Sequence, residues 1–121
     1  MTTPDRSAGA DAVFDALGDP TRRAILQQVA RYGPITATEV AARLPVSRQA
    51  VGKHLVVLGQ AGLVSGERDG RERRFSANSQ PMIEASRWLA ATGAAWDDRL
   101  TRLAARVETR ARAGEAGGER Q

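Results

Sequence analysis

The sequence predicts a mainly α-helical domain that carries one small β-hairpin. Helix start signals recur between residues 19 and 48, and an Asp-Gly turn signal separates two extended runs within residues 63–76. Apolar residues then recur at helical spacing from residue 82 to residue 107. With 121 residues, the chain has the length of one domain.

Composition excludes several classes of protein. There is no cysteine, which excludes disulfides, thiolate metal sites and cysteine nucleophiles, and the one histidine is His54. No glycine-rich phosphate loop, nucleophile with a base, or cluster of carboxylates indicates an enzyme, and we expect no cofactor and no metal. Without a long apolar run or a signal core, the sequence predicts a cytoplasmic protein.

The charge balance is basic and rests almost entirely on arginine. The net charge is +4, and Lys53 is the one lysine among 18 basic residues. Arginine suits two-pronged contacts to phosphate and guanine, which favours a nucleic-acid partner. A GC-rich genome would produce the same composition, so the placement of the charges has to decide.

The first elements are marked by their ends. We expect a flexible arm over residues 1–10, a folded domain over residues 11–112 and a disordered tail over residues 113–121. A short helix stops at Gly18, and Asp19-Pro20 starts a second helix, which Gly33-Pro34 ends.

Two further helices follow with a short connection between them. Thr36 and Glu39 have the spacing of a capping box, and Leu44-Pro45 ends the helix that they start. Ser47 caps the next helix, over residues 48–60. The connection has the length of a helix-turn-helix corner.

Residues 63–76 read as a β-hairpin around Asp69-Gly70. A two-residue turn there sets Val64 opposite Phe75, but it also sets Glu67 opposite Glu72. Because like charges opposite each other are unfavourable, a longer loop stays open as an alternative.

The last helix, from Ser79 onward, carries a heptad-like apolar stripe that a small domain cannot cover alone. For its two tryptophans, Trp88 and Trp96, packing in the core or in a dimer is favoured over a ligand cage.

The order of these elements is that of a winged helix-turn-helix. The segments DALGDPTRRAIL, TATEVAARLPVSRQAVGKHLVVLGQAGLV and DGRERRF resemble the ArsR/SmtB family of bacterial repressors, over roughly residues 12–76. The resemblance implies a homodimer built on the first and last helices, with Phe14, Leu89, Trp96, Leu100, Leu103 and Val107 at the interface. The family often senses metals, but this chain lacks the cysteines of a thiolate sensor.

The candidate DNA-binding residues lie on helix 48–60 and on the hairpin. On a helical wheel the polar residues of helix 48–60 gather opposite its apolar residues, and no acid occurs from Val40 to Gly66. The candidates are Ser47, Arg48, Gln49, Gly52 and Lys53 on the helix, with Arg68, Arg71, Arg73 and Arg74 on the hairpin. At the position of Gly52 the family commonly has serine, so the glycine departs from the pattern.

These observations predict a sequence-specific, DNA-binding transcriptional regulator. We expect a homodimeric repressor that binds a palindromic operator in double-stranded DNA, at the nucleoid. The alternatives are a winged-helix module that binds protein and a non-specific architectural DNA-binding protein. For His54, packing within the domain is favoured over a metal ligand or a proton switch, because no ligand partners are spaced near it.

Overall fold

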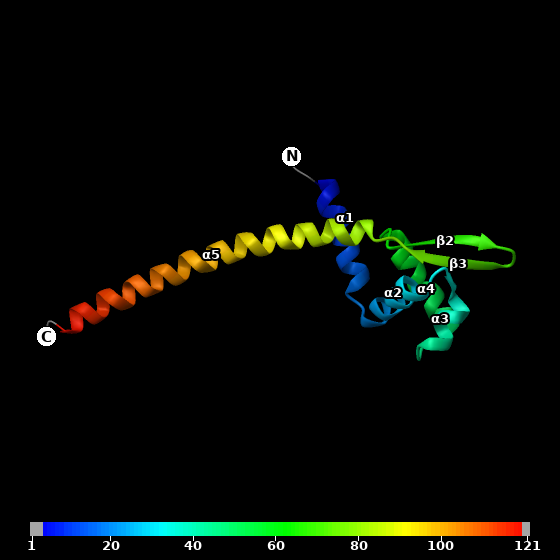
Figure 1. The fold of residues 1–121 in the computed structure, drawn as a ribbon, viewed down its shortest axis with the longest axis horizontal. Coiled ribbons are helices and arrows are strands. Elements are labelled where there is room, and N and C mark those ends of the chain that lie inside the picture. Colours follow the sequence, from blue (N-terminus) through cyan, green and yellow to red (C-terminus); the bar gives the residue numbers. More distant parts are fainter. Residues whose placement is uncertain (1–3, 120–121) are drawn as a thin grey trace. The chain divides into compact units, whose positions relative to one another are not determined.

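The computed structural model describes residues 4–119, and side chains from residue 9 to residue 113 except that of residue 111. In this part of the chain, five helices and three strands follow one another (Figure 1). They are α1 (Pro4–Leu17), α2 (Pro20–Tyr32), β1 (Ile35–Thr36), α3 (Ala37–Arg43), α4 (Arg48–Gln60), β2 (Val64–Asp69), β3 (Glu72–Ala77) and α5 (Gln80–Glu119). The predicted fold class, a mainly helical winged helix-turn-helix, is confirmed.

The chain divides into two compact units, residues 1–86 and residues 87–121. The first holds α1 to α4, the sheet and the start of α5, and the second holds the rest of α5. Among the described residues, no helix is long and apolar enough to cross a membrane.

The predicted helix starts are confirmed atom by atom. Asp19 Oδ1 accepts a hydrogen bond from the Thr21 backbone N–H at 2.8 Å, and Pro20 is the first residue of α2. Thr36 and Glu39 form both halves of the capping box of α3. Ser47 Oγ accepts from the Ala50 backbone N–H at 3.1 Å. Each cap satisfies a backbone donor that the first helical turn leaves free.

The structure differs from the expectation at both ends of the chain. Helix α1 begins at Pro4, inside the expected flexible arm, and α5 continues to Glu119, inside the expected disordered tail. Once a helix is nucleated, each added residue gains one hydrogen bond, so an established helix extends into segments that would not start one. Residues 1–3 and 120–121 of those segments lie outside the described residues.

Two arginines of α2 close the end of α1. Arg22 donates to the Ala16 carbonyl at 2.7 Å and to the Asp15 carbonyl at 3.0 Å, and Arg23 donates to the Leu17 carbonyl at 2.6 Å. The last carbonyls of a helix carry partial negative charge and have no partner inside the helix. The arginine pair therefore fixes the joint between α1 and α2.

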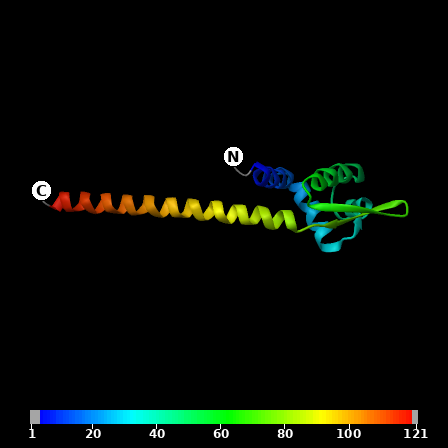
Figure 2. The ribbon, with the colours of Figure 1, turned by 90° about the horizontal axis from the view of Figure 1, so that it is seen from above.

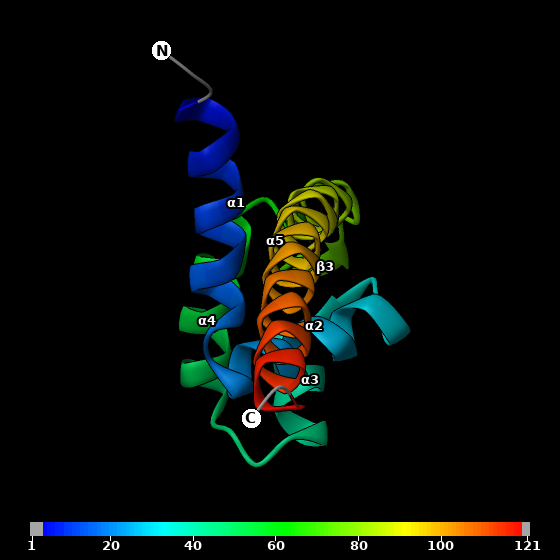
Figure 3. The same ribbon diagram turned by 90° about the vertical axis from the view of Figure 1, so that its left-hand side faces the viewer.

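One hydrophobic core joins the helices and the sheet of the first unit. Helix α1 lies against α2 and α4 (Figure 3). The largest fully buried side chains come from α2, β1, α3 and α4 and from the residue before β2: Ile25, Val29, Ile35, Val40, Val51, Leu58 and Leu63. This core holds α4 by one side only, which leaves its other side free for a partner.

The sheet has the order β1-β3-β2, and all pairs are antiparallel. Strands β2 and β3 run side by side beyond the helices to a tight turn (Figures 1 and 2). We call this hairpin, residues 64–77, the wing. The short strand β1, which the sequence did not indicate, pairs with β3 and ties the wing to the start of α3.

The predicted hairpin register is wrong by one residue on each strand. The two turn residues are Gly70 and Arg71, so Val64 lies opposite Ala77 and Gly66 lies opposite Phe75. Gly70 has φ +66°, which is the conformation that the first position of a type II′ turn requires and that glycine adopts without strain. The shift also places Glu67 opposite Arg74 instead of Glu72.

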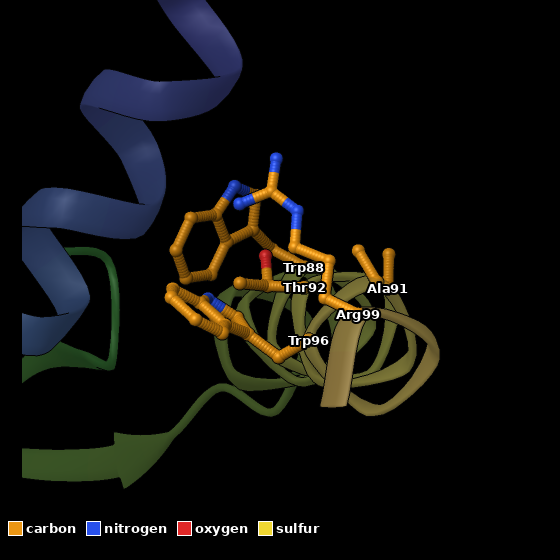
Figure 4. Close-up of a pocket in the computed structure, with 6 residues that line it drawn as sticks. Trp88, Ala91, Thr92, Trp96 and Arg99 are labelled. Atoms are coloured by element: carbon orange, nitrogen blue, oxygen red, sulfur yellow. The ribbon is translucent and has the colours of Figure 1, made fainter. Parts of the chain in front are cut away.

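The apolar stripe of α5 is uncovered in the single chain. Leu89, Trp96, Leu100, Leu103 and Val107 are 53 to 58% exposed. On the same helix, an open hollow is lined by Trp88, Ala91, Thr92, Ala95, Trp96 and Arg99. Figure 4 shows the two indole rings and the Arg99 side chain on one side of the helix, with Arg99 Cζ 5.6 Å from the centre of the Trp96 ring.

Candidate nucleic-acid interface

Helices α3 and α4 form the helix-turn-helix, joined by a short connection (Figure 3). The inner side of α4 carries Val51, Leu55 and Leu58, all of them buried. Burying a side chain of this size stabilises the folded state by roughly 1.5–3 kcal/mol relative to leaving it exposed. These three residues therefore fix which side of α4 faces outward.

The start of α4 presents three polar side chains to solvent. Ser47, Arg48 and Gln49 are all exposed. Arg48 Nε donates to Thr38 Oγ1 on α3 at 2.9 Å, which holds the guanidinium beside the first turn of α4. A side chain at the start of such a helix is well placed to reach base edges in a major groove.

The outward side of α4 continues with Lys53, which is exposed, and Val56, which is 60% exposed. Between them and Gln49 lies Gly52, where an added Cβ would meet no atom within 4 Å. The surface there is open, so the backbone of α4 can approach a partner closely.

The wing has two chemically different faces. Side chains opposite each other across an antiparallel pair share a face, and successive ones alternate. Arg68 and Arg73 are paired and lie on one face. The pairs Glu67 with Arg74 and Asp69 with Glu72 lie on the other. One face therefore carries two arginines, and the other carries three acids with one arginine.

On the acidic face, Arg74 binds three carboxylates with three different nitrogens. Its Nε donates to Asp69 Oδ2 at 3.2 Å, one terminal nitrogen donates to Glu72 Oε2 at 3.1 Å, and the other donates to Glu39 Oε1 at 3.2 Å. Asp69 and Glu72 belong to the wing, whereas Glu39 belongs to α3. Arg74 therefore connects the wing to the helix-turn-helix.

The electrostatics of this group follow from its hydrogen bonds. The side-chain and backbone donors of Thr36 lower the pKa of Glu39, and Arg74 lowers it further. The hydrogen bond to Asp69 is the main cause that raises the pKa of Arg74. Both groups stay ionised at neutral pH, so the contact between α3 and the wing is a charged one.

On the other face, Arg73 lies against Phe75. Its Cζ is 5.8 Å from the centre of the Phe75 ring, and a terminal nitrogen donates to the Gly66 carbonyl at 3.4 Å. A Cβ on Gly66 would collide with Arg73 Nε and would lie 2.8 Å from Phe75 Cε1. Glycine at this position makes room for the ring and the guanidinium together.

His54 lies half-buried on α4. The pKa of Asp19 is lowered chiefly by the hydrogen bond from the Thr21 backbone, and an electrostatic interaction with His54 is the smallest of the causes. In the described residues, no three metal-ligating side chains of histidine, cysteine, aspartate or glutamate come together. Phe14, expected at a dimer interface, is half-buried against the core of its own chain.

Sequence reasoning missed three residues of this surface. Thr38 and Glu39 matter through contacts to Arg48 and Arg74, which are distant in the sequence and leave no local signal. Gly66 does have a local signal in the sequence, because a glycine inside a strand often marks a close approach of neighbouring atoms.

Comparisons with known proteins agree with this arrangement. A family model described as a helix-turn-helix domain matches residues 17–67. An HTH-type transcriptional regulator of Bacillus subtilis, YuzN, is 42% identical over 78 residues, which are 60% of this chain and 85% of the relative. A probable mercury resistance operon repressor of Streptomyces lividans is 37% identical over 112 residues, which are 90% of this chain and 86% of the relative. The solved structure of an ArsR-like transcriptional regulator from a Rhodococcus species is 42% identical with a TM-score of 0.71, and the match covers 80% of this chain and 91% of that one.

The fold and the outward side of α4 define a winged helix-turn-helix protein of the class that regulates transcription by binding DNA. More particularly, the chain belongs to the ArsR family of transcriptional regulators. The family consists of DNA-binding regulators and not of enzymes, as the sequence predicted.

Proposed function

We propose that this chain is a homodimeric, sequence-specific repressor that binds an imperfect palindrome in double-stranded DNA. The observation that carries the proposal is the outward side of α4, which is exposed, free of acids and, apart from Val56, polar, opposite a side fixed by buried apolar residues. DNA repels carboxylates and attracts arginine and lysine, so such a surface suits a major groove.

The residues divide by role. Arg48 and Gln49 read base edges near the start of α4, Ser47 and Lys53 bind phosphates, and Gly52 lets the helix approach. Arg68, Arg71 and Arg73 of the wing bind phosphate and sugar, which positions the protein without reading sequence.

Repression is proposed by analogy with relatives. The Streptomyces protein is named as a probable repressor, and SdpR of Bacillus subtilis, 34% identical over 77 residues, is named as a transcriptional repressor. Binding at a promoter in the cytoplasm would block transcription. Because this chain has no cysteine, thiolate chemistry does not release it from DNA.

The experiment is a footprint on the promoter of its own gene, followed by fluorescence anisotropy on the protected duplex and on random duplex. Gln49→Ala should cost about 1–3 kcal/mol on the operator and little on random duplex. A wild-type protein that binds both duplexes equally would be an architectural protein, and one that binds neither would favour a protein partner.

A further inference from the structure

The wing has a small net charge, but its charges are distributed unequally between its two faces. Its seven charged residues are Glu67, Arg68, Asp69, Arg71, Glu72, Arg73 and Arg74, and their net charge is +1. The register sends Arg68 and Arg73 to one face and the three acids with Arg74 to the other, while Arg71 lies in the turn. A phosphate backbone would be attracted to the first face and repelled by the second.

The guanidinium of Arg74 is already hydrogen-bonded to carboxylates on the acidic face. Three of its nitrogens donate to three carboxylates at 3.1 to 3.2 Å. To bind a phosphate in the same way, it would have to release Asp69, Glu72 or Glu39 beside the DNA. Its position opposite Thr36 in the β1–β3 pair places it where the wing meets α3.

Glu39 receives donors from both sides of this junction. Its Oε1 accepts from the Thr36 backbone N–H at 3.3 Å and from the Thr36 hydroxyl at 3.0 Å, as well as from Arg74. One carboxylate thus closes the cap of α3 and binds the wing. The direction of the wing is linked to the helix-turn-helix through this contact.

We propose that Arg74 is a positioning residue, which holds the wing on α3 and offsets part of the charge of its acidic face, so that the opposite face, with Arg68 and Arg73, meets the DNA backbone. The proposal rests on the proposed function, and it replaces the expectation that all four wing arginines contact DNA. It assigns the two faces of one strand to two tasks, with Arg73 directed to phosphate and Arg74 to the protein.

Lysine substitutions at the two neighbouring positions separate these tasks. Lysine keeps the charge and still binds phosphate, but it lacks the planar fork that reaches several carboxylates at once. Arg74→Lys should therefore raise the Kd for the operator about threefold to tenfold, nearly as much as Arg74→Gln does. Arg73→Lys, the matched control, should bind nearly as the wild type, whereas Arg73→Gln should lower the salt slope of log K by about 1.8 per dimer.

For Glu39→Gln, the two possible roles of Arg74 predict changes in DNA affinity of opposite sign. Glutamine still completes a capping box, so α3 keeps its start while the charge that binds Arg74 is lost. If Arg74 holds the wing, Glu39→Gln weakens DNA binding in the wild type and no longer does so in the Arg74→Gln background. If Arg74 instead contacts phosphate, removing the competing carboxylate tightens binding, and the proposal is overturned.

A measurement without DNA separates this proposal from the proposed function. Amide hydrogen exchange in β2 and β3 should be faster in Arg74→Lys and in Glu39→Gln than in the wild type or in Arg73→Lys. Unchanged exchange in both variants would overturn the positioning role. A wild type that binds no DNA while these two variants loosen the wing would overturn the proposed function and leave the positioning role supported.

Discussion

Two residues at the start of α4, the N-cap Ser47 and the first helical residue Arg48, add a structural role to the DNA-binding role proposed for them. Ser47 caps the helix with its hydroxyl, and Arg48 binds Thr38 on the neighbouring helix, yet both side chains remain exposed. A long side chain that is already held in place loses less conformational entropy when DNA binds, which lowers the free-energy cost of binding. The first turn of α4 is therefore pre-organised within the protein.

Gly52 lowers the stability of helix α4 but leaves its outward surface open. An added Cβ meets nothing within 4 Å, so Gly52→Ala should raise the free energy of unfolding by about 0.5–1 kcal/mol, measured by urea denaturation. Gly66→Ala is the control and should destabilise the protein, because its Cβ collides with Arg73 and Phe75. A Gly52→Ala protein less stable than the wild type would show that this glycine serves the fold.

The histidine and the missing thiols lead to a second prediction for single residues. With no cysteine and one histidine per chain, a tight transition-metal site lacks its usual ligands. Calorimetric titration with zinc, nickel and copper should show no stoichiometric binding at neutral pH. A tight signal that disappears in His54→Ala would instead identify His54 as a ligand.

Among the elements, helices α2 and α3 each have an ionised carboxylate in their capping interactions, the N-cap Asp19 in α2 and the capping-box residue Glu39 in α3. The pKa of Asp19 is lowered chiefly by the hydrogen bond from the Thr21 backbone, and that of Glu39 by the hydrogen bonds from Thr36. A carboxylate whose pKa is lowered by folding stabilises the folded state above its ordinary pKa. That stabilisation is lost as the pH falls through the lowered value.

Stability should therefore fall as the pH drops below about 4, the ordinary range of these carboxyls. Asparagine also caps helices but does not titrate. Asp19→Asn should then lose less stability than the wild type over the same pH range, and urea denaturation between pH 7 and pH 3 measures the difference. Parallel pH profiles for the two proteins would remove Asp19 from the explanation.

The sequence predicted those elements whose signals are local. The caps at Asp19, Thr36 and Ser47 each depend on atoms no more than three residues apart, and all three are confirmed. The predicted hairpin turn is displaced by one residue, which moves every cross-strand partner by two, because Asp69-Gly70 and Gly70-Arg71 both offer a glycine, and the choice depends on the packing of Phe75 against Gly66. The bond between Arg74 and Glu39 spans 35 positions, a separation that no local pattern reveals.

For the whole molecule, the two units set different requirements. The first unit has its own core, from Val13 to Ala85. In the second, residues 87–119 are one helix whose apolar stripe is exposed along its length. An isolated helix obtains most of its stability from packing an apolar face, so this stripe requires a partner.

We expect that partner to be a second copy of the chain, held through the stripe of α5. Leu100 and Leu103 are 58 and 55% exposed in the single chain. Burying a leucine fully in a dimer interface would stabilise the dimer by roughly 1.5–3 kcal/mol. Replacing both with glutamate would place charges inside the interface. The variant should sediment as a monomer at micromolar concentration, where we expect the wild type to sediment as a dimer.

The same variant should lose operator binding for a geometric reason. A two-fold dimer presents two α4 helices to successive major grooves, about 34 Å apart, and so binds both half-sites at once. A monomer forfeits the second half-site, which should weaken binding by about 100-fold or more. The matched control, Ala91→Glu with Ala105→Glu, adds the same two charges to the opposite side of α5, and it should remain dimeric and keep its affinity. A wild type that is monomeric at micromolar concentration, or a control that dissociates equally, would mean that the α5 stripe is not the dimer interface.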